Sequence, residues 1–169
     1  MMDQAWRALP VCLLLTPGAA PAAGGEERIG DWAYRSGSGR DGAGFAASAD
    51  APGKGSLVFA CDAPGPGSVR VSFVAREYLG GVSAIRRLLQ LKVDDGPLVT
   101  REWGYAGNVA YDRDRGQALR LARRLRGART LVVRATTWTF ETVEATLPVG
   151  SAGQALARLY RDCGDGGTP

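Results

Sequence analysis

Two cysteines that lie far apart in the sequence constrain the fold of this chain more than any other feature. The chain has three cysteines: Cys12 lies in an apolar N-terminal segment, Cys61 ends an apolar run of strand length, and Cys163 ends the last segment with helical periodicity. A bridge between Cys61 and Cys163 would close a loop of roughly 100 residues, for which the chain-entropy model gives about 4.7 kcal/mol. We therefore predict a Cys61–Cys163 disulfide, with two buried free thiols as the alternative.

The N-terminus has the composition of a secretory signal peptide. Arg7 supplies positive charge, residues 11–15 form a short apolar core, and residues 20–22 fit a small-residue cleavage site. Residues 1–22 are therefore expected to be a signal peptide, and a disordered N-terminus is the alternative. No other segment has the run of apolar residues that a membrane span needs. We expect an exported protein, in the periplasm or secreted. Without residues 1–22 it would hold two cysteines, Cys61 and Cys163, and an even number in an oxidising compartment favours a disulfide.

Alternating apolar and polar residues predict a mainly antiparallel sheet. The clearest strand is residues 68–76, in which Val69, Val71, Phe73 and Ala75 share one face. Turn sequences such as residues 62–67 and 94–97 join neighbouring strands into hairpins. The segments with strand character are 29–34, 45–49, 57–61, 68–76, 89–94, 98–103, 108–111, 130–136 and 140–147.

Two segments carry helix signals. Asp114 is expected to cap a helix that ends at Gly127. Ser151 and Gln154 predict a capping box at the start of the last helix, and Gly164 predicts a left-handed end. The expected fold is α+β: a sandwich-like, mainly antiparallel domain of about eight or nine short strands and two helices, the last helix disulfide-linked to a central strand.

The expected organisation is a signal peptide over 1–22, a flexible leader over 23–28, a single globular domain over 29–164 and a disordered tail over 165–169. No internal repeat and no linker sequence between domains appears in the chain, which is why a single domain is expected.

The composition argues against most catalytic sites. The chain has no histidine, which removes histidine-based triads and histidine metal ligands. Glu141 and Glu144 are expected on opposite faces of a strand, which is wrong for a paired acid and base. Residues 37–42 match the glycine spacing of a dinucleotide-binding loop, but no helix is predicted after them. We therefore expect no catalytic residue, no metal site and no cofactor.

Two other groups of residues are candidates for binding. Trp138 and Phe140 are expected on one strand face, where they either join the core or line a binding surface. An arginine-rich segment could contact an anionic partner, or it is simply a solvated helix face. The absence of aromatic residues between residues 113 and 134 argues against a stacking surface for nucleic acid. The arginines of this possible anionic-partner surface are Arg113, Arg120, Arg123, Arg124 and Arg126.

Several short elements match a known family in order along the chain. Residues 57–61 (LVFAC), 78–80 (YLG), 92–94 (KVD), 125–134 and 150–163 resemble elements of the type VI secretion-associated periplasmic proteins of the VasI or TagO group. The chain is also similar to invasion-associated locus B-like exported proteins in its tryptophan near the start and its paired cysteines. Neither resemblance brings catalytic residues, and both imply an exported accessory or binding role.

We therefore expect a non-enzymatic accessory protein of the bacterial envelope that binds another envelope or secretion-system protein. The alternative is a small exported inhibitor or immunity-type protein that acts on a secreted enzyme. An enzyme of unrecognised type is a third possibility, and a cleft that raised the pKa of Asp94, Asp112 or Glu141 would favour it.

Overall fold

A computed structural model describes residues 25–39, 42, 44–80, 86–112 and 114–169. The predicted signal peptide, residues 1–22, lies outside the described residues. The elements, in chain order, are β1 (Glu26–Ile29), β2 (Trp32–Ser36), β3 (Phe45–Ala51), β4 (Gly55–Cys61), β5 (Arg70–Ala75), β6 (Arg86–Val93), β7 (Val99–Ala106), β8 (Val109–Tyr111), α1 (Arg115–Leu125), β9 (Thr130–Thr136), β10 (Thr142–Pro148) and α2 (Ala152–Asp162).

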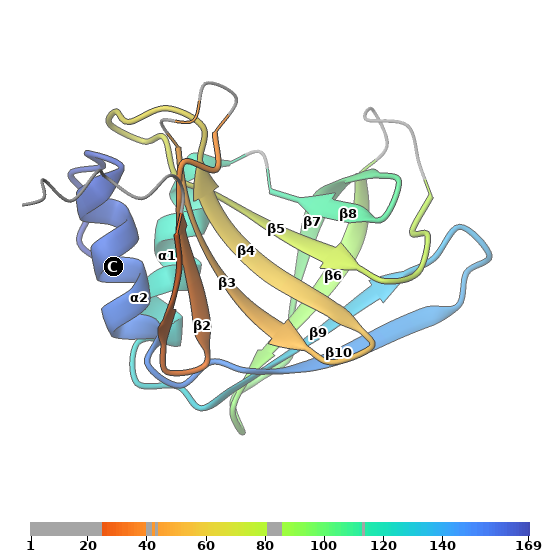
Figure 1. Cartoon of the computed structure of the whole chain (residues 1–169). Coiled ribbons are helices and arrows are strands. Elements are labelled where there is room, and N and C mark those ends of the chain that lie inside the picture. The colour runs from red at the N-terminus through yellow and green to blue at the C-terminus, as the bar shows by residue number, and fades with distance from the viewer. Residues whose placement is uncertain (1–24, 40–41, 43, 81–85, 113) are drawn as a thin grey trace, which may run out of the picture.

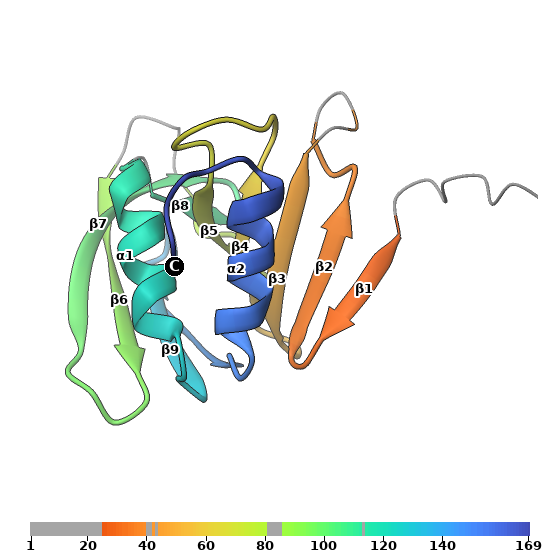
Figure 2. The ribbon, with the colours of Figure 1, turned by 90° about the vertical axis from the view of Figure 1, so that its left-hand side faces the viewer.

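The strands of the described residues form one ten-stranded sheet in the order β1-β2-β3-β4-β5-β8-β7-β6-β9-β10. Every neighbouring pair is antiparallel. The sheet curls until β10 packs against β3 and β4 (Figure 1). Both helices lie side by side at one end of this curled sheet (Figure 2). The predicted α+β, mainly antiparallel fold with two helices is confirmed, with ten strands where about eight or nine were expected.

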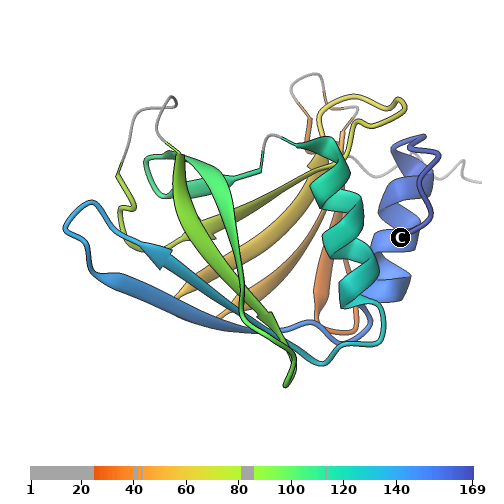
Figure 3. The ribbon, with the colours of Figure 1, turned by 180° about the vertical axis from the view of Figure 1, so that it is seen from behind.

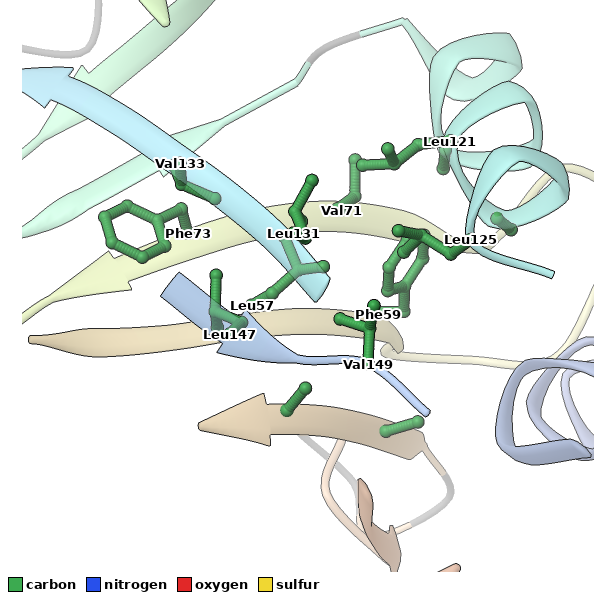
Figure 4. Packing of buried hydrophobic residues seen from close by; sticks show 14 of the residues in the cluster. Leu57, Phe59, Val71, Phe73, Leu121, Leu125, Leu131, Val133, Leu147 and Val149 are labelled. Atoms are coloured by element: carbon green, nitrogen blue, oxygen red, sulfur yellow. The ribbon is translucent and has the colours of Figure 1, made fainter. Parts of the chain in front are cut away.

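The core fills the inside of the curl. Strand alternation places one face of each strand there, and the predicted inward face of β5 is confirmed because Val69, Val71, Phe73 and Ala75 are all buried. Helix α1 closes the core at its end of the sheet. Figure 4 shows the facing side chains: Leu57, Phe59, Val71, Phe73, Leu131, Val133, Leu147 and Val149, with Leu121 and Leu125 of α1.

The ends of the helices agree with three of the four predicted signals. The Asp114 carboxylate accepts a hydrogen bond from the Gly116 N–H (2.8 Å), which confirms the N-cap of α1, and Gly127 follows α1 in the left-handed region. Gly164 has φ +62° and ends α2. The capping box of α2 is wrong: Ser151 itself has φ +65° and its side chain makes no capping hydrogen bond, because the short passage from β10 into α2 requires a left-handed residue there.

The N-terminal boundary of the domain also differs from the expectation. Glu26–Arg28, expected in the flexible leader, belong to the edge strand β1. The predicted strand 29–34 is split because Gly30, at φ +58°, turns the chain between β1 and β2. An ion pair from Arg35 to Glu26, 2.6 Å long, spans the same hairpin.

The last five residues, expected to form a disordered tail, have defined contacts. The tail returns from α2 into the space between the two helices (Figure 2). The Arg123 Nε donates a hydrogen bond to the Thr168 carbonyl (3.0 Å), and Pro169 is buried. The glycine-rich composition of this segment predicts disorder, and the contacts that order it are made with a distant helix, so they leave no signal in the local sequence.

The predicted disulfide is present between Cys61, at the end of β4, and Cys163, at the end of α2. The carbonyl of Cys163 also accepts a hydrogen bond from the Gly65 N–H (2.7 Å). On β2, two strands away from β4 in the sheet, the Tyr34 hydroxyl donates to the Asp162 carboxylate (2.6 Å), and the Arg158 guanidinium lies 4.2 Å from the centroid of the Tyr34 ring. The end of α2 is thus joined to β2, to β4 and to the loop after β4.

Removal of the disulfide tests how much it stabilises the domain. We expect the double substitution Cys61→Ala/Cys163→Ala to lower the free energy of unfolding by about 2–5 kcal/mol, because it releases a long loop in the unfolded chain. Urea denaturation of the oxidised protein and the variant measures this difference. A loss below about 1 kcal/mol would show that the helix end is held mainly by its other contacts.

Asp94 gives the fold a pH dependence of known sign. Its carboxylate accepts hydrogen bonds from the Arg129 and Thr130 N–H groups (3.0 and 2.8 Å), linking the β6–β7 turn to the start of β9. The backbone N–H of Thr130, and then that of Arg129, lowers the pKa of Asp94 below its ordinary value of 3.8. A group with a lowered pKa in the folded state stabilises the fold above its unfolded pKa, and this contribution is lost as the pH falls.

The substitution Asp94→Asn removes this charge and suits the left-handed backbone of position 94, which has φ +46°. We expect the wild-type protein to be more stable than the variant at pH 7. The gap should narrow as the pH falls below 3.8, the ordinary pKa of the carboxyl. Urea denaturation at several pH values checks this, and a gap that did not change with pH would contradict the role of the carboxylate.

Candidate functional site

The loop after β5 and the turn between β9 and β10 lie at the end of the curled sheet away from the helices (Figure 1), and they carry a group of exposed aromatic side chains. Tyr78 is 57% exposed, Trp138 59% and Phe140 87%. They come from the loop after β5 and from the turn between β9 and β10. We call Tyr78, Trp138 and Phe140 the aromatic end. The other large exposed apolar side chains of the described residues are Leu88 and Leu98. Three of the five such side chains therefore belong to the aromatic end.

Hydrogen bonds give the β9–β10 turn a defined shape. The Thr137 N–H donates to the Glu141 carbonyl (2.8 Å), and the Phe140 N–H donates to the Thr137 carbonyl (3.1 Å). The buried Thr137 hydroxyl accepts from the Glu141 N–H (3.1 Å) and lies 2.8 Å from the Thr139 hydroxyl. These hydrogen bonds hold the backbone of the turn that carries Trp138 and Phe140.

Phe140 sits at this turn in an unfavourable backbone conformation. Its φ is +65°, a left-handed value that a bulky residue adopts at a cost of about 1–3 kcal/mol. The ring is 87% exposed, so the burial of the side chain does not compensate for this cost. A strained, exposed aromatic residue is typical of a binding surface.

Arg87 joins the two segments that form the aromatic end. Its Nη1 donates to the Leu79 carbonyl (3.0 Å) in the loop after β5 and to the Thr137 carbonyl (3.3 Å) in the β9–β10 turn. Its guanidinium also lies 5.6 Å from the centroid of the buried Tyr105 ring, within reach of a cation–π interaction. Arg87 therefore links both segments of the aromatic end to the core.

Glycine allows the same two segments to approach closely. Gly80 has φ +79°, and a Cβ at this position would lie 2.3 Å from the Cβ of Trp138. No real side chain tolerates that distance, so Trp138 takes its place against the loop only because residue 80 is glycine.

An open hollow of about 580 Å³ lies beside the aromatic end. Carboxylates outnumber cations around it, with Glu77, Glu141 and Glu144 against Lys54. Glu144 is paired with Arg134 of the adjacent strand (2.5 Å). The remaining lining residues are Tyr78, Thr137, Trp138, Thr139, Thr142 and Val143. Rings, hydroxyls and carboxylates of this kind suit the binding of a partner with apolar and basic groups.

Sequence reasoning identified two of these aromatic residues but not their setting. Trp138 and Phe140 were expected on a strand face, yet β10 begins only at Thr142. Both lie in the turn and are exposed, so they do not join the core, which was one of the two alternatives for them. Tyr78 was singled out only as part of a family resemblance, and Arg87 was missed because an inward-facing arginine on a strand has no local signal.

The described arginines of the possible anionic-partner surface do not all share one surface, although Arg120 and Arg124 line the same cavity. Arg113 lies outside the described residues. Arg120 forms an ion pair with Asp114 (2.7 Å), and the Arg123 side chain donates to the tail. Arg126 faces α2, where its Cγ would lie 3.4 Å from a Cβ at Gly153. Arg124 lines a cavity together with Arg120. Helix α1 thus directs these residues to different neighbours.

The candidate carboxylates have different electrostatic settings. Backbone N–H groups lower the pKa of Asp94, whereas burial raises the pKa of Asp112, which also lines a cavity between α1 and the sheet. Of the two, only Asp112 has the raised pKa in a cavity that would favour an enzyme. Glu141 lies in the exposed turn. Within the part of the chain that the structure describes, no three histidine, cysteine or acidic side chains come together as a metal site. No helix of that part is long and apolar enough to span a membrane.

Comparison of the chain with models of protein families, with curated proteins and with solved structures gives no match.

Strain at Phe140 has a measurable consequence. We expect Phe140→Gly to raise the free energy of unfolding by about 1 kcal/mol, because glycine adopts a left-handed backbone without the steric cost. Phe140→Ala removes the same ring but keeps a Cβ, so its stability should stay near that of the wild type. Urea denaturation compares the three proteins. Equal stabilities of the glycine and alanine variants would show that residue 140 is not strained.

Proposed function

We propose that this protein is an exported, non-enzymatic accessory protein of the bacterial envelope that binds another envelope or secretion-system protein through the aromatic end. The observation that carries the proposal is Phe140, whose backbone is left-handed although its ring is 87% exposed and gains no burial within the described fold. The predicted signal peptide and the resemblance to secretion-associated periplasmic proteins support the location and the class of partner.

Aromatic residues are efficient binding groups when they are already ordered. Tryptophan and tyrosine are enriched among the residues that dominate interface energies, and a ring held in place loses little conformational entropy on binding. The hydrogen-bonded β9–β10 turn and the Arg87 contacts supply that order. The aromatic end is therefore suited to bind a partner without rearrangement.

The charges around the hollow indicate what the partner offers. Glu77 and Glu141 are exposed carboxylates, while Glu144 shares its charge with Arg134. Complementary charge increases the rate of association and discriminates among partners. We infer a partner surface with an apolar side chain that enters the hollow and with lysine or arginine at its rim.

The second candidate function is a small exported inhibitor or immunity-type protein. The observation that favours it is the β9–β10 turn, a short hydrogen-bonded loop that carries the exposed Phe140. An inhibitor that inserts a side chain into the cleft of an enzyme would use such a loop. The two functions differ in the partner, since an inhibitor abolishes the activity of a secreted enzyme on binding it.

Paired variants test the proposal. We expect mature oxidised protein immobilised on a resin to retain one or more envelope proteins, and the double substitution Trp138→Ser/Phe140→Gly to reduce their recovery about tenfold or more, a loss of about 1.4 kcal/mol. Leu98→Ser removes an exposed apolar side chain (42% exposed) outside the aromatic end and serves as the control. Quantitative mass spectrometry of the eluates measures the recovery.

Two results would contradict the proposal. One is equal recovery of every envelope protein by the wild type and the double variant. The other is an equal loss with Leu98→Ser, which would indicate non-specific apolar adhesion. A single retained enzyme whose activity falls on addition of the protein would favour the inhibitor instead.

A further inference from the structure

A second cavity lies at the other end of the molecule, between α1 and the sheet. It has a volume of about 90 Å³. Its floor is apolar, formed by Val71, Leu91, Val99 and Leu121 of β5, β6, β7 and α1. Residues of α1 and of the β6–β7 hairpin line this cavity, and Figure 3 shows the positions of these two elements. The proposed function does not involve this site.

Two simple periodicities bring arginines to this cavity. Residues 99, 101 and 103 lie at every second position of β7 and so share one face, which aligns Arg101 with the buried Trp103. Residues 117, 120, 121 and 124 lie on one face of α1, since positions three and four apart are neighbours on a helix. Arg101, Arg120 and Arg124 therefore line one small space.

The positive charge of these residues is only partly neutralised within the described chain. Arg120 is paired with Asp114 (2.7 Å). Arg101 donates only to the carbonyl of Thr100 (3.3 Å), and neither Arg101 nor Arg124 has an ion pair among the described residues. Asp112 is the one carboxylate in the lining. The cavity is therefore cationic over an apolar floor.

Trp103 adds a donor that lacks an acceptor. The residue is 2% exposed, and its indole Nε1–H has no hydrogen-bond partner among the described residues. A buried, unpaired N–H costs about 1–3 kcal/mol, and such groups are rare enough in native structures to need an explanation. An acceptor atom bound in the adjoining cavity would satisfy this N–H.

We propose that this cavity binds a carboxylate carried on two or three carbon atoms. Arg101 and Arg124 would pair with the carboxylate, the indole N–H of Trp103 would donate to one of its oxygens, and the carbon chain would lie against the apolar floor. The volume of about 90 Å³ is below the roughly 150 Å³ of a cavity that admits benzene. Asp112 disfavours a doubly charged phosphate at the same place.

The carboxylate has two possible sources, a free short-chain acid or a glutamate side chain of another protein. Propionate represents the first, and a short peptide with one glutamate and blocked ends represents the second. Binding of propionate assigns the site to a free acid, and binding of the peptide alone assigns it to a glutamate side chain. Either result supports a carboxylate site.

The test follows the indole N–H resonance of Trp103 in the ¹⁵N-labelled, oxidised protein. We expect a saturable downfield shift on titration with propionate or the peptide, with a Kd on the order of 1 mM for so small a ligand. Arg124→Gln should weaken binding about tenfold. Arg123→Gln is the matched control, because Arg123 lies on the same helix and contacts the tail instead, and it should leave the Kd unchanged.

Three outcomes would overturn the proposal. The Trp103 resonance could fail to respond to either ligand, the two arginine substitutions could weaken binding equally, or chloride and inorganic phosphate at the same concentration could give the same shift. The last two results would identify a general effect of anions on a basic protein.

Discussion

The Cys61–Cys163 disulfide is the constraint on which the arrangement of this domain depends. A helix packed at the end of a curled sheet can slide or detach, because apolar packing has no direction. The disulfide joins the C-terminal end of α2 to β4, and the hydrogen bond from Tyr34 to Asp162 joins the last turn of α2 to β2. Helix α1 and the tail pack beside α2. The position of both helices on the sheet therefore depends on the disulfide and on polar contacts together.

With one end closed in this way, the opposite end is free to carry residues that do not serve stability. The aromatic end combines a strained Phe140, exposed rings and a close approach of Trp138 to Gly80. Such features persist only where the surrounding structure determines them. The curled sheet provides this support through Arg87, whose side chain joins the loop and the turn to the core. Under the proposed function, partner binding uses the aromatic end, whereas the disulfide stabilises the opposite end of the same sheet.

The alternation along β5 and the aspartate cap of α1 were predictable because each depends on a few neighbouring residues. The pairing of Cys61 with Cys163, which lie 102 residues apart, was predictable from the number of cysteines and the expected compartment instead. The failed capping box at Ser151 shows the limit, because a tertiary connection forces that residue into a left-handed conformation. The candidate site was only partly predictable for the same reason. Trp138 and Phe140 stand out in the sequence, but the left-handed turn and the inward Arg87 depend on strands distant in the chain.

The proposed function places the partner-binding surface at the end of the sheet remote from the helices. Amide hydrogen exchange of the oxidised protein, alone and bound to a partner that it retains, tests this most directly, since binding slows exchange where the interface forms. The account predicts new protection in residues 76–80 and 137–142, with little change in α1, α2 and β1. Protection confined to the helices or to β1 would contradict it and would place the binding surface at the disulfide-linked end.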